Sequence, residues 1–386
     1  MHYNTIMHQL QTLIPRHSFE TAQNHYCGNR YVKYFNCWNQ FTVMLYALAS
    51  GKESLRDIQN SLMVQMPKLY HLGLTSIKRS TLSDTNKRMD YRIYEELFYL
   101  MLNRCKNFSN KHKFKFKNPL MLLDATVIDL SITSFPWAKY MRKKGALRLH
   151  YQYDYSDQIP TFLVVTDAKQ HEITVTRSFF TIVPDSIYCF DRGYIDFGWL
   201  YSINTKKAFF ITRNKPNHVY RVTGQHTENK KNNIISDEYI EFSGNLRKDR
   251  YPEKLRLIRF KDPETNEILE FLTNNFTLSA STISNVYKCR WQIEVFFKWI
   301  KQNLKIKTFF GTSKNAVLTQ IWVAMCYFLL LAYIKFQSKY KYSLFYLHKI
   351  IKETIMERLN LIDLLNITDS LLPKIKCTDQ QLALTF

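Results

Sequence analysis

Apolar positions along the chain follow two spacings, and the change from one to the other divides the chain into three regions. Residues 1–105 repeat at helical spacing, and residues 120–275 contain short strand-like runs with one helical period at 195–204. Helical spacing returns at 287–305 and continues from residue 313. The clearest early helical periods are 41–48, 55–63 and 93–102, with Gly51 as a break. The pattern predicts helices, then an α/β region, then helices again.

The strand-like runs of the middle region form two groups. The first group comprises 120–132, 147–155, 161–167, 186–192 and 208–213. The second comprises 220–223, 238–242, 255–260 and 268–272, with turn residues between the runs and no long helical period. The second group predicts a β subdomain inserted at about 214–275.

The most regular helical period is 287–305. With Tyr287 set at zero and about 100° per residue, Arg290, Glu294, Lys298 and Lys301 fall within roughly 80° of one another. The apolar residues Val286, Cys289, Ile293, Phe296, Phe297, Ile300 and Leu304 fill the opposite side. No proline or glycine interrupts the run, and Ser279 is the candidate N-cap. We expect one amphipathic helix with a single carboxylate among cations and a phenol.

Two interpretations of this polar face are open. An Arg290–Glu294 pair at i,i+4 is common on solvated helices and contributes only about 0.3–0.5 kcal/mol. However, Asp124 lies inside a strand-like apolar run and Asp191 at the end of another. A buried carboxylate is costly unless it is paired or holds a metal. Three carboxylates that converge from distant segments are what a divalent-metal phosphoryl-transfer site requires.

Each aspartate also has a competing interpretation. Asp129 is a second carboxylate in the same run as Asp124, and a separation of five residues places the two on opposite faces of a strand, so one of them is structural. Asp191, before Gly193, is also a favourable helix N-cap. Both interpretations are open on the sequence.

Composition narrows the class of partner. The 386 residues are 46% hydrophobic and 15% aromatic, which is typical of a folded protein, and the formal net charge is +22. A large polyanion is the expected partner for so strong an excess of positive charge. Nucleic acid is the first candidate, and an anionic membrane surface is the second. The apolar run 321–334 is short for a membrane span and predicts a buried core helix.

The cysteines and the N-terminal residues indicate the cellular compartment in which the chain is expected to act. The seven cysteines are scattered, without C-x-x-C or zinc-type spacing, and the first residues lack the pattern of a signal peptide. We therefore expect a reduced, intracellular environment, and a chain that acts in the cytoplasm.

Two basic segments outside the helix at 287–305 are candidate DNA contacts. Residues 76–89 fit the second helix of a helix-turn-helix, in which Lys78, Arg79, Lys87 and Arg88 contact DNA, although an ordinary helical bundle explains them equally well. Residues 106–119 alternate lysines with aromatic residues and predict either an edge strand or a basic linker.

The order and spacing of these motifs resemble those of a known family. Tyr287, Arg290, Glu294 and Lys301 match the Tyr-Arg-Glu-Lys signature of DDE transposases of bacterial insertion sequences, the insertion-sequence-four group. Similar stretches surround the two aspartates (L-D-A-T-V-I-D-L and F-D-R-G-Y), and F-L-T-N-N-F-T-L-S-A precedes the signature. The N-terminal G-K-E-S-L-R-D-I resembles the helical domain found in part of the group, so the resemblance covers nearly the whole chain.

The resemblance implies a role for each matched residue. Asp124, Asp191 and Glu294 would be the catalytic triad and would hold two Mg²⁺ ions, with Mn²⁺ as a substitute. Tyr287, Arg290 and Lys301 would contact DNA phosphates near the cleaved end. Two further DNA contacts come from position alone: Lys298 from helical geometry, and Arg192 because it follows the second aspartate.

The resemblance also implies an architecture. We expect a helical N-terminal domain at 1–105 that binds DNA ends, and a basic linker or edge strand at 106–119. A ribonuclease-H-like DDE catalytic domain follows at 120–310, with the β subdomain inserted at about 214–275. A C-terminal helical region occupies 311–386.

The implied function is DNA transposition by cleavage and strand transfer on double-stranded DNA, at the element ends and at a target. We expect a homodimer assembled on DNA, on the bacterial nucleoid and without a membrane. The alternatives are a metal-dependent nuclease without strand transfer, a non-catalytic DNA-binding derivative, and a peripheral membrane protein, which the lack of an amphipathic face at 321–334 disfavours.

Overall fold

The structure, a computed structural model, describes residues 4–105, 113–141, 144–226, 233–243, 250–304 and 308–371. The chain forms two compact units. The first combines Met1–Asn107 with Gln302–Phe386, and the second comprises Phe108–Lys301. The two ends of the chain therefore belong to one unit, whereas the spacing of apolar residues predicted two separate regions.

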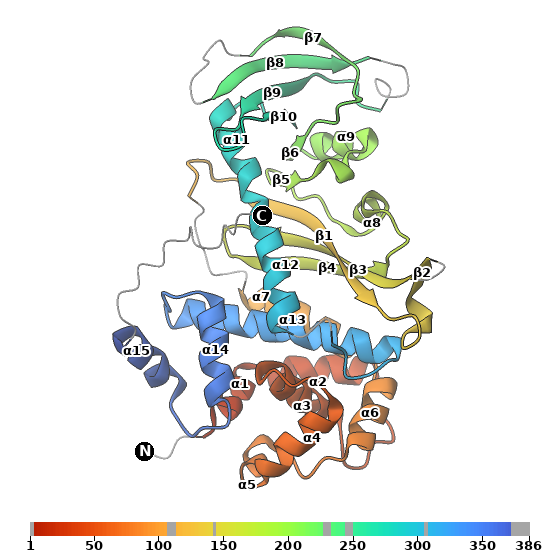
Figure 1. The fold of residues 1–386 in the computed structure, drawn as a ribbon, viewed down its shortest axis with the longest axis vertical. Helices are drawn as coiled ribbons and strands as arrows, with labels where there is room; N and C mark the ends of the chain where they lie inside the picture. The colour runs from red at the N-terminus through yellow and green to blue at the C-terminus, as the bar shows by residue number, and fades with distance from the viewer. Residues whose placement is uncertain are drawn as a thin grey trace. The chain divides into compact units, whose positions relative to one another are not determined.

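Helices make up the described part of the first unit (Figure 1). They are α1 (Ile6–Leu13), α2 (Arg16–His25), α3 (Cys37–Ala49), α4 (Leu55–Val64), α5 (Met66–Leu69), α6 (Arg79–Arg88), α7 (Arg92–Cys105), α13 (Lys314–Gln337), α14 (Leu344–Thr354) and α15 (Leu361–Leu371). Asn36 and Ser54 cap α3 and α4 through their side-chain oxygens. Gly51 lies between these helices at φ +69°, a backbone conformation that favours glycine. The predicted periods at 41–48, 55–63 and 93–102 correspond to α3, α4 and α7.

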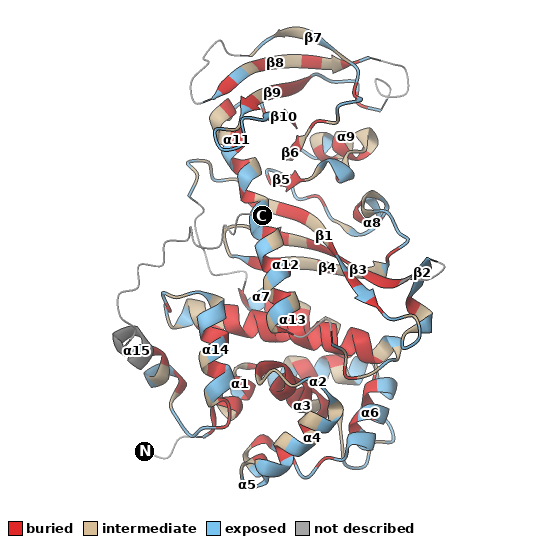
Figure 2. Ribbon diagram, in the orientation of Figure 1, coloured by how far each residue is buried: buried red, intermediate tan, exposed pale blue. Residues whose placement is uncertain are grey.

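The helix α13 is the core of the first unit. It is buried along nearly its whole length (Figure 2) and packs against α3, α6, α7 and α14. Its 24 residues satisfy the length and composition of a membrane span, but 94% of its most apolar window is buried inside the protein. The helix is longer than the predicted run 321–334, and its burial confirms the prediction of a core helix.

A mixed sheet forms the second unit, with ten strands among the described residues. Its first six strands are β1 (Leu120–Leu130), β2 (Lys139–Met141), β3 (Lys144–Asp154), β4 (Ile159–Asp167), β5 (Ile187–Phe190) and β6 (Phe209–Arg213). The strand β3 is antiparallel to both β1 and β4, whereas β5 is parallel to β1 and β6 is parallel to β5. The sheet therefore joins an antiparallel group to a parallel group at β1.

The remaining strands extend this same sheet. They are β7 (Tyr220–Gln225), β8 (Ile234–Phe242), β9 (Leu255–Lys261) and β10 (Ile268–Thr273), and the order continues β6-β10-β9-β8-β7. Because β10 pairs antiparallel with β6, the segment expected as a β subdomain at 214–275 continues the central sheet rather than forming a sheet of its own.

Four α-helices complete the described part of the second unit: α8 (Glu172–Phe179), α9 (Phe197–Thr205), α11 (Ala280–Cys289) and α12 (Trp291–Asn303). The helix α12 lies against β3, where Phe296 packs on Tyr151 and Tyr153 with ring centroids 5.2 and 5.1 Å apart. The apolar side predicted for 287–305 is buried, as expected. This packing directs the polar side of α12 away from the face of β3.

The prediction of one continuous helix at 287–305 is wrong. The segment forms α11 and α12, with Arg290 between them. The Arg290 N–H donates to the Tyr287 carbonyl (3.0 Å), and the Ile293 N–H donates to the Arg290 carbonyl (3.1 Å), which is the tighter i to i−3 spacing. No proline or glycine marks this point. Lys305 lies outside the described residues.

Candidate active site

Strand register brings Asp124 and Asp191 to neighbouring positions. The parallel pairing of β1 with β5 ends at Leu123 opposite Phe190; Asp124 is the next residue of β1, and Asp191 directly follows the end of β5. The Asp124 side chain is 16% exposed, whereas Asp129 is exposed further along β1. The sequence left the choice between Asp124 and Asp129 open, and burial favours Asp124 as the carboxylate that needs a partner.

Arg290 supplies that partner. Its Nη1 donates to Oδ2 of Asp124 at 2.9 Å, and its Nη2 lies 2.7 Å from Oε1 of Glu294. The i,i+4 pair expected on a solvated face therefore exists, but Arg290 also reaches a strand 166 residues earlier in the chain. The guanidinium bridges two carboxylates that come from β1 and α12.

The electrostatics of the site couple three carboxylates. Burial raises the pKa of the Asp124 carboxyl to about 7. The negative charges of Asp191 and Glu294 act in the same direction on this pKa. The Arg290 guanidinium opposes the rise, and so does the Ala125 N–H, which donates to Asp124 Oδ1 at 2.8 Å. Asp124 is thus in a partly desolvated position near two other acids.

Asp191 acts as a cap in this structure, as its competing interpretation predicted. Its Oδ1 accepts from the Gly193 N–H at 2.8 Å, at the start of the short 3₁₀ helix Arg192–Tyr194. A Cβ at Gly193 would lie 2.9 Å from Asp191 Oδ1 and 3.2 Å from Glu172 Oε2. The absence of a side chain at Gly193 therefore leaves space for both carboxylates.

Glu172 is an acidic residue near Asp191 that was not predicted from the sequence. It begins α8, a helix that was not predicted, and it pairs with Arg148 of β3 at 3.8 Å. Burial raises the pKa of the Glu172 carboxyl, and the negative charge of Asp191 raises it further. The only sequence signal was a carboxylate in the first turn of a short helical stretch, which is too common to indicate a site.

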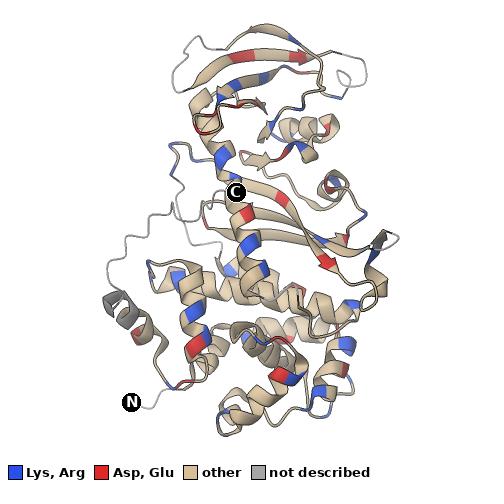
Figure 3. Ribbon diagram, in the orientation of Figure 1, with Lys and Arg blue, Asp and Glu red and all other residues tan. Residues whose placement is uncertain are grey.

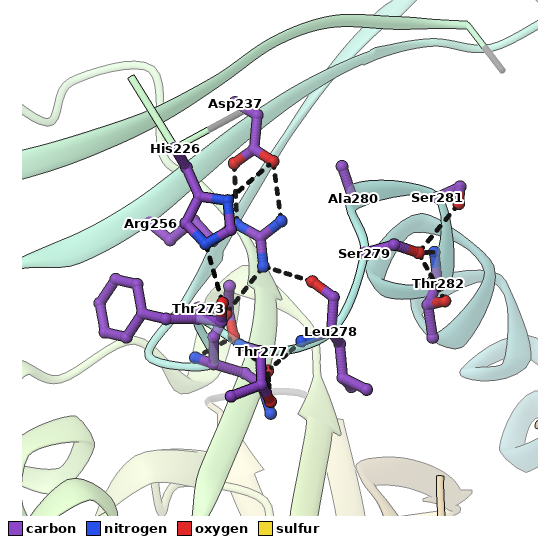
Figure 4. Close-up of polar contacts among 12 residues, drawn as sticks. His226, Asp237, Arg256, Thr273, Thr277, Leu278, Ser279, Ala280, Ser281 and Thr282 are labelled. Atoms are coloured by element: carbon purple, nitrogen blue, oxygen red, sulfur yellow. Dashed lines mark hydrogen bonds and ion pairs between the residues drawn. The ribbon is translucent and has the colours of Figure 1, made fainter. Parts of the chain in front are cut away.

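The start of α11 is fixed by a buried polar cluster (Figure 4). Ser279 caps α11, as predicted, by accepting from the Thr282 N–H. Just before this cap, Nη1 of Arg256 donates to the carbonyls of Asn275 (3.0 Å) and Leu278 (2.6 Å). The chain that leads into the signature segment is therefore held by β9.

The other predicted DNA contacts are spread along the same region. Tyr287 is half-buried, and its ring packs on Phe271 with centroids 4.9 Å apart. Lys298 and Arg192 are exposed, and Lys301 is half-buried. Along α12, the acidic Glu294 is followed by two lysines, Lys298 and Lys301 (Figure 3). The structure brings Arg290 into contact with two of the predicted acids and leaves Lys298 and Arg192 at the surface.

The basic segments outside this region are only partly described. Lys78, Arg79, Lys87 and Arg88 are exposed on α6 or immediately before it. Residues 113–119 form no strand, so the edge-strand alternative is wrong for this part, and Lys113, Lys115 and Lys117 are exposed. Lys111 and the rest of 106–112 lie outside the described residues.

The carboxylates of this site are suitable ligands for a divalent cation, although in the described structure they do not surround a single point. Carboxylate oxygens are the ligands that Mg²⁺ and similar hard cations prefer. Asp124 is desolvated and coupled to Asp191 and Glu294. Over the described ranges, no group of three His, Cys, Asp or Glu side chains is spaced to hold an ion. The chemistry of the donors fits a metal, and Arg290 contacts two of them, Asp124 and Glu294.

Comparisons with known proteins identify the family of this chain. The family described as "Transposase DDE domain" matches residues 115–329, more than half of the chain, and a domain of unknown function, DUF4372, matches residues 2–75. The protein is therefore an enzyme that acts on DNA, a transposase. The chain belongs to the transposase DDE domain family, which confirms the resemblance to DDE transposases of insertion sequences and implies dependence on a divalent metal.

Individual relatives carry the same description. A Geobacillus stearothermophilus protein described as a transposase for insertion sequence element IS5377 is 29% identical over 269 residues, 69% of this chain and 70% of that protein. A Sinorhizobium fredii protein described as transposase y4zB is 32% identical over 254 residues, 65% of this chain and 69% of that protein. Among solved structures, the piggyBac transposase synaptic complex with hairpin DNA aligns with a TM-score of 0.45 and 9% identity, over 95% of this chain and 79% of that one.

Proposed function

We propose that this transposase binds the ends of its insertion sequence and catalyses metal-dependent strand cleavage and strand transfer. The observation that carries the proposal is the convergence of three acids: the register of β1 with β5 brings Asp124 beside Asp191, and Arg290 joins Asp124 to Glu294 of α12. An acid on β1, a second directly after the parallel strand β5 and a third on α12 give the donor set that phosphoryl transfer requires.

The fold proposed for this site is ribonuclease-H-like. In support, β4, β3 and β1 are antiparallel neighbours, and β5 and β6 follow in parallel beyond β1. In this arrangement Asp124, Asp191 and Glu294 hold the ions, two Mg²⁺ with Mn²⁺ as a substitute. We assign 120–310 to catalysis, 1–105 to recognition of DNA ends, 106–119 to a basic linker and 311–386 to a C-terminal helical region.

Bound metal would activate a water or 3′-hydroxyl and stabilise the leaving oxygen of an in-line displacement at phosphorus. The chain's own residues position the DNA. Burial raises the pKa of the Tyr287 phenol to about 12, so the phenol stays protonated and donates to a phosphate oxygen. Arg290 offers a planar fork to a phosphate, while Lys301 acts as a point charge. Lys298 and Arg192 are exposed and add further phosphate contacts.

The partners follow from the same proposal. The formal net charge of +22 suits double-stranded DNA, both at the element ends and at the target. Coordinated cutting of two ends requires two active sites, so we propose a homodimer assembled on DNA. Such a protein would work in the cytoplasm, on the nucleoid.

Strand transfer is tested with a labelled element end, a supercoiled target plasmid and Mg²⁺. The proposal predicts a covalent product in which the labelled end is joined to the plasmid. Cleavage without a joined product would identify a nuclease, and binding without cleavage would identify a non-catalytic DNA-binding derivative. The Glu294→Gln variant serves as the control, because any joined product it forms cannot come from this site.

A further inference from the structure

The guanidinium of Arg290 contacts two carboxylates at once, those of Asp124 and Glu294. Nη1 contacts Asp124 at 2.9 Å and Nη2 contacts Glu294 at 2.7 Å. Charge-assisted hydrogen bonds of this kind are roughly twice as strong as neutral ones. The single positive charge of the fork therefore offsets part of the repulsion between two carboxylates, and it does so within the protein.

These are the same carboxylates that the proposed function assigns to metal. A guanidinium and a divalent cation that share two carboxylates repel each other, and the repulsion is greater where water is partly excluded. The exposed fractions of Asp124 and Arg290 are only 16% and 18%, so water screens the repulsion poorly. Arg290 and a metal ion therefore compete for Asp124 and Glu294.

The position of Arg290 allows its side chain to move away from Asp124 and Glu294. It lies at the junction of α11 and α12, where regular helical hydrogen bonding is interrupted. Its Nε is buried and makes no hydrogen bond in the described structure, so the present arrangement leaves one donor unsatisfied. A phosphate can satisfy several guanidinium donors at once. The guanidinium carbon already lies 5.9 Å from the ring centroid of Tyr287, the other proposed phosphate contact.

We propose that Arg290 is an internal counter-cation that is exchanged on assembly: it holds Asp124 and Glu294 without metal, and it turns to a DNA phosphate when a divalent ion takes these carboxylates. The inference rests on the proposed function, because it takes the metal ligands from it. The exchange predicts that metal binding strengthens the contact between Arg290 and DNA. It also predicts that the enzyme without DNA binds metal weakly.

The first test measures metal affinity without DNA. Mn²⁺ is titrated into the full-length protein and free Mn²⁺ is followed by electron paramagnetic resonance, for wild type, Arg290→Gln and Lys288→Gln. We expect Arg290→Gln to bind Mn²⁺ more tightly by on the order of tenfold, within the range typical of coupled sites. Lys288→Gln removes one exposed positive charge two residues away and should change the affinity less than twofold. Equal or weaker binding by Arg290→Gln overturns the exchange.

A second variant protects this test against misfolding. Arg290→Lys keeps the charge but reaches only one carboxylate, so it should bind Mn²⁺ a few-fold more tightly than wild type. If circular dichroism shows that Arg290→Gln is unfolded, Arg290→Lys carries the test alone. An unchanged or lower Mn²⁺ affinity in a folded Arg290→Lys protein then overturns the inference.

The second test measures the other half of the exchange. Binding of a duplex element end is followed by fluorescence anisotropy in EDTA and in Ca²⁺, in which cleavage is slow. Wild type and Lys288→Gln should both gain affinity on addition of Ca²⁺, and Arg290→Gln should lose most of this gain. An equal Ca²⁺-dependent gain in wild type and Arg290→Gln overturns the inference.

The Asp124→Asn variant distinguishes a failure of the metal assignment from a failure of the exchange. If Asp124→Asn binds Mn²⁺ as tightly as wild type, the metal assignment fails, and the proposed function and the inference fall together. If Asp124→Asn loses Mn²⁺ binding while Arg290→Gln leaves it unchanged, the proposed function stands and only the exchange is overturned.

Discussion

Arg256 and Asp237 form a buried ion pair between β9 and β8. Nε of Arg256 donates to Oδ1 of Asp237 at 2.8 Å, Nη2 donates to Oδ2 at 2.7 Å, and each side chain is 1% exposed. The same guanidinium holds the carbonyls of Asn275 and Leu278, which lead into α11 (Figure 4). This pair therefore connects the inserted strands to the helix that carries Tyr287.

Breaking this pair should destabilise the protein strongly. We predict that Asp237→Asn or Arg256→Gln lowers the free energy of unfolding by about 3–5 kcal/mol, because either change leaves a buried group without its partner. Urea unfolding followed by circular dichroism measures the loss. The matched control is Arg221→Gln, which breaks an exposed pair with Glu241 between the neighbouring strands β7 and β8, at 75% exposure for the arginine. It should cost less than about 1 kcal/mol, and equal losses in both pairs would contradict the account.

The raised pKa of Asp124 predicts a pH-dependent stability in the absence of metal. The folded state binds this proton more tightly than the unfolded state, because burial raises the pKa from its usual 3.8 to about 7. The contribution of Asp124 to stability is therefore complete below about pH 4 and is lost as the pH rises through about 7, by up to about 1.4 kcal/mol per pH unit within this window.

The Asp124→Asn variant isolates this contribution. In EDTA, the difference in unfolding free energy between Asp124→Asn and wild type should shift in favour of the variant from pH 5.5 to 7 and level off above pH 7.5. Urea titrations at each pH measure it, with Asp129→Asn, an exposed carboxylate on the same strand, as control. A difference that is independent of pH would show that Asp124 is not desolvated in the free protein.

Gly193 should matter to catalysis more than to stability. A Cβ at this position would come within 2.9 Å of Asp191 Oδ1. We predict that Gly193→Ala displaces this carboxylate and lowers the rate of end cleavage about tenfold or more, with little change in melting temperature. Gly198→Ala is the control, because its Cβ would lie an ordinary 3.4 Å from Asp196 Oδ1 and alanine favours helix α9. Unchanged cleavage by Gly193→Ala would contradict the role given to Asp191.

The basic face of α12 should determine the salt dependence of DNA binding. We predict that Lys298→Gln or Lys301→Gln lowers the slope of log K against log salt by about 0.9, the value for one phosphate contact on duplex DNA. Anisotropy titrations between 50 and roughly 200 mM salt measure the slope. Lys261→Gln, an exposed charge at the end of β9, should leave it unchanged. If all three variants have the same slope, α12 does not track the DNA backbone.

The sequence predicted the positions that local chemistry determines. The strand around Asp124, the Ser279 cap and the buried side of 287–305 follow from apolar spacing and capping preferences, which are short-range. The break at Arg290 was not predictable, because no proline or glycine produces it and its side chain is held by Asp124, 166 residues away. Glu172 was missed for a similar reason: only the fold brings the start of α8 to Asp191.

Strand pairing was the second feature that could not be predicted from the sequence. Alternating apolar residues located β7 to β10, but they did not show that β10 pairs with β6. The neighbouring positions of Asp124 and Asp191 likewise depend on the register of β1 with β5. Both depend on hydrogen bonds between residues that are far apart in the sequence, and the local residue pattern does not specify them.

The most direct test of the account is Mg²⁺-dependent cleavage of DNA that carries the element's own ends, by wild type, Asp124→Asn and Glu294→Gln in parallel, with end binding measured by anisotropy. We predict that wild type cleaves only with divalent metal, and that both variants still bind the ends but cleave more than about 10²-fold more slowly, because each loses a carboxylate donor. Cleavage at the wild-type rate by either variant would contradict the assignment of Asp124 and Glu294 to the metal site.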